Sequence, residues 1–448
     1  MGYLAVMRLQ LFVRVLAAFG VCTVTSAAFA QSTLPLRQSI DDAEAAIEDP
    51  VVTPVPLPAE PPPPPPRRRA AADPYAPLGI SVGAAQLYPS ITIGSAVTSN
   101  VARTPKNREA DIGLFLRPSL RTESDWVRHS WSSNISGDLT YYAGRDDLNA
   151  RDLDLSQRLR LDVRRGTTAE FETGYALSQS GLEDSDVPAT AVGLQTEHTM
   201  TSSAAFSHDF GGVEGRVRAG ATWRIIEDVK LSGGGKQDND DREYIEPSLS
   251  LRATLTDPPV FKPFAEVAYT PRIHNLTFDR NGLRRDSDGY SGSIGVNIDN
   301  GPIWTGDLAL TYLYRTYDDP ALDDNSALGI NGNLTWSPTD LTRIVWSMGT
   351  SLNESTSATS SGSRTWTFGW AGTYDIRENV TIGAGSGVEL EKGEGGLDIT
   401  YDANLAVSWK LNPALAWTAG YDLTWLDAAS GGRGYSEHRV TTGMTLSR

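Results

Sequence analysis

One stretch of the chain, Pro302–Arg315, alternates with a period of two along its whole length. The face that begins at Trp304 and ends at Tyr312 and Tyr314 is apolar, and the other face is polar or small except at Leu313. A period of two is the side-chain repeat of a β-strand. Ten residues at ~3.3 Å rise and ~40° tilt span roughly 25 Å, which is the height of the apolar band of an outer-membrane barrel. Aromatic rings at both ends suit two membrane–water interfaces. An edge strand of a soluble sandwich would share this pattern.

The same alternation recurs from Leu87 to the C-terminus, and one of its segments runs from Val127 through His129 to Tyr141. The connections alternate as well, because short ones such as Arg164–Gly166 are followed by long polar ones such as Gly181–Glu197. Outer-membrane barrels have short periplasmic turns, longer external loops and an even number of strands. We therefore predict an all-β fold over residues 81–448. The fold is a transmembrane up-and-down antiparallel β-barrel of about 18 strands (16–18).

The first 30 residues have the features of a secretory signal peptide. Arg8 and Arg14 precede the apolar run Val15–Val24, and Ala28–Ala30 is a small-residue cleavage site. Met7 is a second candidate start. Cleavage after Ala30 would remove Cys22, the only cysteine, so neither disulfides nor thiol chemistry are expected in the mature protein. A signal peptide in front of a barrel predicts the outer membrane as the location.

Residues 31–80 differ from the rest in composition and predict a disordered periplasmic linker with one short, weak helix over Leu36–Ile47. The unbroken prolines Pro61–Pro66 and the basic Arg67–Arg69 end a proline-rich run. Such a run adopts an extended polyproline helix and spans roughly 50 Å at ~3.1 Å per residue. The linker would be an inert spacer, a tether to the cell wall or a periplasmic partner, or a plug that folds back into the barrel.

Charge and motifs exclude other classes of function. A net charge of −16 argues against nucleic acid as a partner. No G-x-S-x-G motif occurs and no histidine sits in a recognisable nucleophile motif, so no enzyme, cofactor or dedicated metal site is expected. The five histidines are His129, His198, His208, His274 and His438. The external loops are acidic, with clusters at Asp238, Asp240 and Asp241 and at Asp318, Asp319, Asp323 and Asp324, but their spacing is not that of an EF-hand.

If the apolar face meets lipid, the other face lines the lumen. In the early strands that face carries a ladder of charges. The predicted ladder residues are Arg117, Arg121, Arg128, Arg158, Arg160, Glu170, Glu172, Arg216, Arg218, Glu246 and Arg252. If Gly166 takes a left-handed conformation in a three-residue hairpin, Arg160 faces Glu170 and Arg158 faces Glu172. In the late strands the same face carries small neutral residues, which predicts a smooth wall. These are Asn331, Asn333, Thr365, Thr367, Gly383, Gly385, Gly387, Thr400, Asn404, Thr418, Thr441 and Gly443.

Several strand and turn motifs from Leu87 onward resemble the putative β-barrel porin type 2 family of Gram-negative bacteria. They are Leu87–Ile91, Ser99–Val101, Leu116–Leu120 and Trp336–Thr339. The resemblance implies an outer-membrane, pore-like barrel, and some relatives belong to polysaccharide export systems. It implies no catalytic residue. The chain departs from barrel proteins at its end, where Arg448 replaces the terminal aromatic residue that the barrel insertion machinery reads.

The leading functional expectation is passage of small polar solutes across the outer membrane. The expected partners are outer-membrane lipid and lipopolysaccharide, the barrel insertion machinery, and a periplasmic protein at residues 31–80. Two alternatives stay open. One is a conduit for exopolysaccharide export that works with that periplasmic partner, and the other is a structural barrel whose lumen is plugged.

Overall fold

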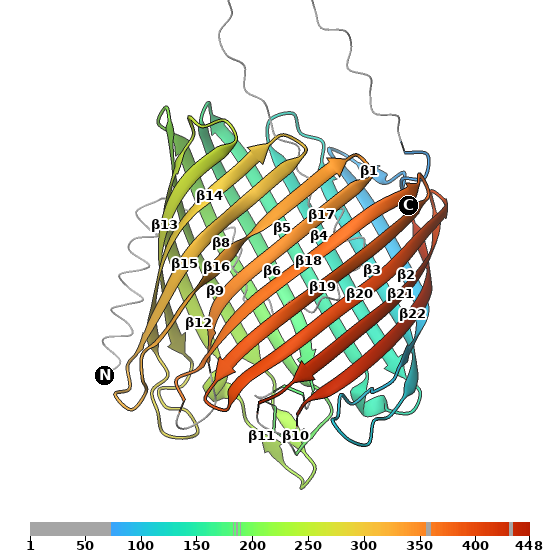
Figure 1. The fold of residues 1–448 in the computed structure, drawn as a ribbon, viewed down its shortest axis with the longest axis vertical. Helices are drawn as coiled ribbons and strands as arrows, with labels where there is room; N and C mark the ends of the chain where they lie inside the picture. The colour runs from blue at the N-terminus through green and yellow to red at the C-terminus, as the bar shows by residue number, and fades with distance from the viewer. Residues whose placement is uncertain (1–72, 182, 185–186, 189, 355–359, 430–432) are drawn as a thin grey trace, which may run out of the picture.

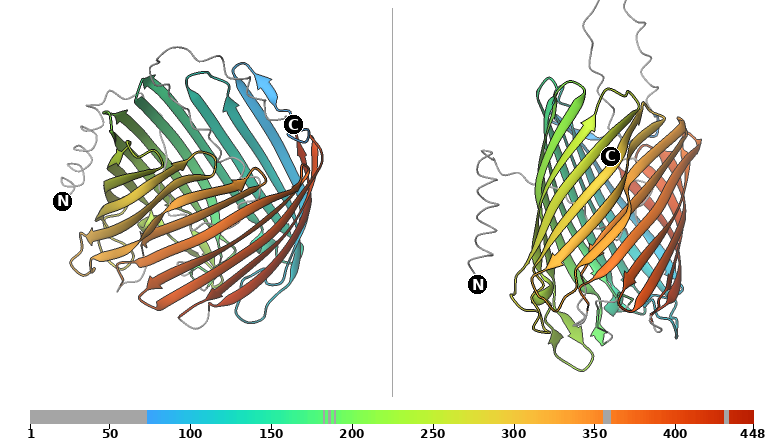
Figure 2. Two further views of the ribbon diagram at one scale, coloured as in Figure 1. Left: turned by 45° about the horizontal axis from the view of Figure 1, so that its top comes forward. Right: turned by 60° about the vertical axis from the view of Figure 1, so that its left-hand side comes forward.

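The computed structural model describes residues 73–448 except for 182, 185–186, 189, 355–359 and 430–432. The predicted signal peptide and residues 31–72 of the predicted linker therefore lie outside the described residues. Eighteen long strands form one antiparallel sheet, which closes into a barrel because β22 pairs with β2 (Figures 1 and 2). This confirms the predicted architecture and strand number. Among the described residues, no helix has the length and hydropathy of a membrane-spanning segment.

Each barrel strand runs between the two ends of the wall and pairs with its neighbours in chain order. The strands are β2 (Ala85–Thr98), β3 (Asp111–Ser124), β4 (Ser130–Tyr142), β5 (Ala150–Arg164), β6 (Thr167–Ser180), β8 (Gln195–Asp209), β9 (Val213–Ile226), β12 (Tyr244–Leu255), β13 (Phe261–His274), β14 (Ser287–Asn300), β15 (Trp304–Tyr317), β16 (Asn325–Thr339), β17 (Thr342–Asn353), β18 (Ser363–Arg377), β19 (Val380–Gly393), β20 (Gly396–Asn412), β21 (Leu415–Asp427) and β22 (Tyr435–Ser447).

The apolar faces point outward, as the alternation predicts. Leu114 and Ile294 are 67% and 72% exposed, which suits a wall bathed in lipid rather than a soluble protein with a dry centre. Stacked aromatic rings mark both ends of this outer face. Trp304 stacks on Trp336 at 5.4 Å between ring centroids near one end, and Tyr401 stacks on Trp425 at 5.3 Å toward the other. Such rings prefer the membrane–water interface because one edge is apolar and the other is polar.

The two ends of the barrel differ in their connections. Short turns lie at the end that also holds the C-terminus, and the longer loops lie at the opposite end (Figure 1). By the rule for outer-membrane barrels, the short turns are periplasmic and the long loops are extracellular. One connection departs from the predicted alternation, because β19 and β20 are joined at the extracellular end by a tight hairpin with Gly393 paired to Gly396.

The seam where β22 meets β2 is tightly packed on its inner side. The ring of Phe115, on β3, lies over Gly94 of β2 and Gly443 of β22, and Phe115 is only 3% exposed. A Cβ on Gly443 would lie 3.1 Å from Phe115 Cζ, and one on Gly94 would lie closer still, so the ring needs glycine on both strands. A hydroxyl pair, Thr92 and Thr445, joins the strands at 2.8 Å.

Short elements extend both ends. At the periplasmic end, β1 (Ile80–Val82) folds back on β2 and fills the position beyond the end of β22. At the extracellular end, β7 (Ala191–Val192), β10 (Val229–Leu231) and β11 (Lys236–Gln237) form a small separate sheet, and two 3-10 turns cover Asp146–Leu148 and Asp240–Arg242.

Candidate functional site in the barrel lumen

The central part of the predicted charge ladder lies on the inner face of β5, β6 and β9. Gly166 is left-handed, with φ of +71°, and Arg158 pairs with Glu172 and Arg160 with Glu170 across β5 and β6. The predicted register is therefore correct. Arg158 Nε donates to Glu172 Oε1 at 2.6 Å, and Arg160 Nη1 lies 3.6 Å from Glu170 Oε1.

The ladder continues across one intervening strand. Arg216 of β9 contacts Glu170, and Arg218 Nη2 lies 3.3 Å from Glu172 Oε2, although β8 lies between β9 and β6. This reach is possible because β8 presents only Ser203, Ala205 and Ser207 at these positions. Each glutamate is thus held by arginines from both sides.

Arg117 and Arg252 pair in the same way and also stack on phenylalanine rings. Arg117 Nε donates to Asp138 Oδ2 at 2.8 Å, and its guanidinium lies 4.2 Å from the centre of Phe115. Arg252 lies 3.7 Å from Glu266, 3.5 Å from Asp307, and 3.5 Å from the centre of the Phe264 ring. At the periplasmic end, Arg121 lies 4.6 Å from the Tyr88 ring and 3.6 Å from Glu123. Cation–π contact and ion pairing together fix these long side chains against the wall.

The prediction for Arg128 is wrong. The segment Val127–His129 belongs to the periplasmic turn between β3 and β4 and not to a strand. Arg128 is exposed there, and its Nη2 donates to the carbonyl oxygen of Val163 at 2.7 Å. The alternation of apolar residues runs on through this turn, so a period of two alone could not locate the strand end.

The late wall is less neutral than predicted. The small neutral residues predicted for this wall share the inner face of β16 to β22, but acidic side chains lie on the same face in its extracellular half. They are Glu389, Glu391, Asp398, Asp402, Asp422 and Glu437. Asp402 accepts from Thr424 Oγ1 at 2.9 Å, and Glu437 accepts from Thr98 Oγ1 at 2.8 Å, which fixes their inward direction. The sequence contains this signal, because each acid lies an even number of residues from a small neutral residue on the same strand.

A loop from β6 is tied to β22, five strand positions away around the barrel, at the extracellular mouth. Glu183, in the β6–β8 loop, accepts from Arg103 Nη1 at 2.7 Å, and Arg103 Nε donates to Glu437 of β22 at 2.8 Å. Arg433 Nη1 donates to the Glu183 carbonyl oxygen at 3.3 Å. Four strands, β2 to β5, separate β6 from β22, so the loop crosses part of the opening. Burial alone would lower the pKa of Arg103, but the two glutamates hold it well above its usual value.

A second loop is anchored by a dry cluster of charges that the sequence analysis missed. Glu354, just after β17, forms an ion pair with Arg272, whose Nη1 lies 2.9 Å from Glu354 Oε1, and its Oε2 lies 3.0 Å from His274 Nε2. Glu246, a ladder residue, belongs to this cluster, because it lies 2.7 Å from Arg272 and 3.0 Å from Arg315. The Arg272 side chain is 2% exposed. Burial would raise the pKa of Glu354, but Arg272 and His274 hold it well below its usual value.

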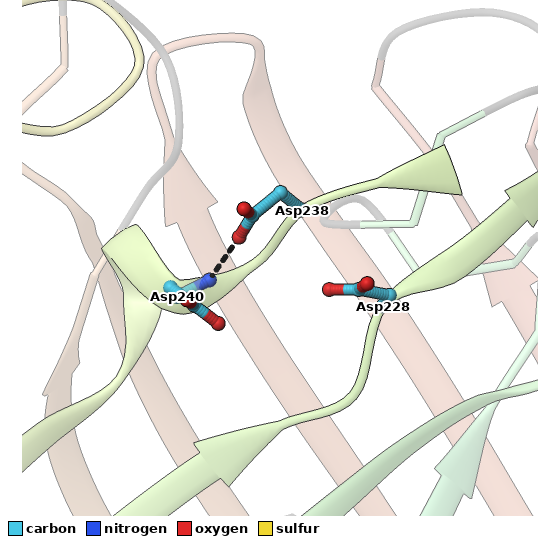
Figure 3. A group of neighbouring side chains, drawn as sticks. All are labelled: Asp228, Asp238 and Asp240. Carbon is cyan, nitrogen blue, oxygen red and sulfur yellow. Dashed lines mark hydrogen bonds between the residues drawn. The ribbon is translucent and has the colours of Figure 1, made fainter. Parts of the chain in front are cut away.

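Three carboxylates in the β9–β12 loop lie close together (Figure 3). The ligand atoms of Asp228, Asp238 and Asp240 lie within 4.8 Å of one another and could offer oxygens to a hard cation such as Ca²⁺. All three are exposed, Asp238 already accepts from the Asp240 amide at 2.9 Å, and Lys236 lies 3.6 Å from Asp228. The arrangement is that of a solvated acidic loop.

Several solved structures align with the chain over most of its length. OccK1 (OpdK) of Pseudomonas aeruginosa is 9% identical, with a TM-score of 0.38 over 81% of this chain and 99% of that one. OpdL of the same species is 12% identical, with a TM-score of 0.38 over 82% and 99%. A mutant of its ferric enterobactin receptor PfeA is 11% identical, with a TM-score of 0.38 over 81% and 80%. Superpositions this loose are no evidence of a shared solute.

No curated protein matches the chain. A family model does match, and it covers residues 73–448, which include every strand of the barrel. Its description is Putative beta-barrel porin 2, in agreement with the resemblance of the strand and turn motifs. The chain is a member of this family of outer-membrane, porin-type β-barrels.

Proposed function

We propose that the barrel is a channel for the diffusion of small polar solutes across the outer membrane. The observation that carries this proposal is the accessibility of charges inside the wall. The side chains of Arg158 and Arg160 point inward at the depth of the membrane, yet they are 46% and 41% exposed. Barrels of 16–18 strands leave an aqueous channel unless something plugs it.

On this proposal, the mouth sets the size of the solutes and the walls set their polarity. The loops that carry Glu183 and Glu354 narrow the extracellular opening, which favours small solutes. The charge ladder and the acidic late wall then present groups of both signs, which orient dipolar solutes as they pass. Apolar solutes would make no favourable electrostatic or hydrogen-bonding contacts with such a lining.

Planar-bilayer recording on the mature protein tests the proposal. We expect stepwise openings in KCl, and we expect liposomes that contain the protein to swell in small sugars but not in large ones. A variant that lacks residues 31–72 keeps Asp73, which lies 3.2 Å from Lys410 at the periplasmic rim, and so leaves the barrel contacts intact. If neither protein gives openings, the barrel is not an open porin.

The same variant addresses the N-terminal predictions and the alternatives. Residues 1–30 are proposed to be a signal peptide, so N-terminal sequencing of the exported protein should begin at Gln31. Openings that appear only without residues 31–72 would mean a plugged barrel. Loss of surface polysaccharide on deletion of these residues would favour the export conduit with a periplasmic partner.

A further inference from the structure

A row of five polar side chains crosses the outward face of the early strands. Cross-strand pairing joins Thr122 of β3 to Ser133 of β4, Ser133 to Gln157 of β5, Gln157 to Thr173 of β6, and Thr173 to Ser202 of β8. The side chains alternate along each strand with the inward ones, so these five residues, the outer polar row, face the membrane and not the lumen. None of them carries a charge.

Apolar residues border the outer polar row on both sides. One bordering row consists of Leu120, Ile135, Leu155, Tyr175 and Met200, and the other of Trp131, Leu159, Phe171 and Ala204. Gln157, Thr173 and Ser202 stand at the middle of β5, β6 and β8. Because each of these strands crosses the whole wall, the three residues lie near the centre of the hydrocarbon, where water and lipid headgroups are absent.

The described part of the chain leaves the hydrogen-bonding groups of the row unsatisfied. Among the residues that the structure describes, none donates a hydrogen bond to these five side chains or accepts one from them. Another outward hydroxyl differs, because Thr442 Oγ1 accepts from Trp417 Nε1 at 3.1 Å. Gln157 has the largest unmet demand, since its amide carries two N–H donors and one acceptor oxygen. Acyl chains offer neither donors nor acceptors, so contact with lipid would leave this demand unmet at a high cost in free energy.

We propose that two copies of this chain meet at the outer polar row within the membrane, related by a twofold axis that passes near Gln157. A twofold contact places a surface against the same surface, so that surface must be complementary to itself. The row meets this condition, because hydroxyl and amide groups both donate and accept. Two facing Gln157 amides can exchange a pair of hydrogen bonds, whereas a partner of another kind would need a matching pattern of its own.

The small side chains of the row suit close approach. Ser133 and Ser202 are only 7% and 6% exposed, so larger neighbouring side chains stand above them, and Gln157 is the longest side chain of the row. Beyond Ser202 the row continues into Ala221 of β9. Small side chains at a contact let two membrane-embedded surfaces approach closely enough for hydrogen bonds. The contact lies on the outside of the wall, so it does not depend on whether the barrel conducts.

Single-molecule photobleaching of the labelled full chain in lipid vesicles tests the proposal. We expect dimers that dissociate as the lipid-to-protein ratio rises. Q157L removes the amide from the row and should weaken the association about tenfold, as expected for two hydrogen bonds between membrane-embedded side chains. The matched control is S386L in β19, because Ser386 also faces outward at mid-strand, opposite Trp370. β19 is separated from β5 by β4, β3, β2, β22, β21 and β20, so the control should change the association less than twofold.

Cysteine cross-linking in intact outer membranes gives a second measurement. Cys22 is the only cysteine of the chain, so in a C22S background Q157C introduces the only thiol. Oxidation with copper phenanthroline should join two copies of the Q157C variant but not two copies of the S386C variant. A wild type that is monomeric at every lipid ratio, equal effects of Q157L and S386L, or a Q157C cross-link formed only with another protein would each overturn the proposal. Heat-modified migration on gels checks that every variant folds.

Discussion

Two groups of ion pairs in this barrel use the same residue types in opposite surroundings. In the mid-lumen ladder, the arginine side chains around Glu170 and Glu172 are 24–46% exposed. In the mouth cluster, the side chains of Arg272 and His274 are 2% and 1% exposed. The ladder arginines are open to solvent, whereas the basic side chains of the cluster are almost fully buried, so equal numbers of charges should differ in their effect on stability.

The difference assigns each group a separate task. A wet ion pair contributes roughly 0–1 kcal/mol, so the ladder is poorly suited to holding the barrel together but well placed to act on passing ions. A dry cluster carries a desolvation cost that only its full set of partners offsets. Removing one charged residue of the cluster would leave its partners buried without a counter-charge, which lowers stability. The cluster is therefore suited to holding a loop in one position.

The largest expected effect is that of E354Q. It leaves Arg272 and His274 without the carboxylate that both contact, and it should lower the free energy of unfolding by about 3 kcal/mol. Urea unfolding in lipid vesicles, followed by tryptophan fluorescence, measures this change. The matched control is E227Q, which breaks an exposed pair with His198 and should cost less than about 1 kcal/mol. Equal costs would abolish the distinction between wet and dry pairs.

The pH dependence of the same variant sharpens the comparison. Because the folded-state pKa of Glu354 lies below its unfolded value, its contribution is complete above about pH 4.3 and is lost as the pH falls through the folded-state pKa. The unfolding free energies of wild type and E354Q should therefore differ fully at pH 5 to 7 and converge only in more acidic solution. A difference that vanishes already at pH 6 would contradict this assignment.

A smaller effect on stability is expected in the ladder. The E170Q/E172Q double variant should cost about 1 kcal/mol or less per pair but should remove two negative charges that contact four arginines facing the lumen. We expect the chloride-to-potassium permeability ratio, measured from the reversal potential in a KCl gradient, to rise roughly fivefold. An unchanged reversal potential would show that ions do not pass along this wall.

The smallest effect is expected for R128Q. Arg128 lies in an exposed periplasmic turn, so its removal should leave the reversal potential where it is in the unmodified protein. The unfolding free energy should change by less than about 0.5 kcal/mol, as for most surface substitutions. A shift like that of the ladder variant would show that Arg128 faces the lumen.

The sequence was sufficient for features that depend on alternation and on local turns. The outward face of Trp304–Tyr314, the strand number and the pairing of Arg158 with Glu172 all follow from a period of two and one glycine hairpin. The mouth could not be predicted in this way. Glu354 and His274 are 80 residues apart, and their contact depends on the path of a loop, which has no periodicity.

The two errors have different origins. Val127 and His129 continue the apolar alternation into a turn, so the pattern itself was misleading at Arg128. The inward direction of the acids in the late strands could be predicted from the sequence, because Glu389 lies two residues after Gly387 and Asp402 two after Thr400. They share the inner face with the small residues, and a fuller reading of the same alternation would have predicted them.

The seat of Phe115 has a consequence for assembly. The ring packs against Gly94 in the first barrel strand and Gly443 in the last. It therefore becomes buried only after the last strand has paired with the first. Contacts between segments so distant in sequence form slowly, because the chain between them loses conformational entropy before the contact forms. A molecule stalled one strand short would leave this ring open to water, and the aromatic side chain thereby distinguishes a finished cylinder from an incomplete one.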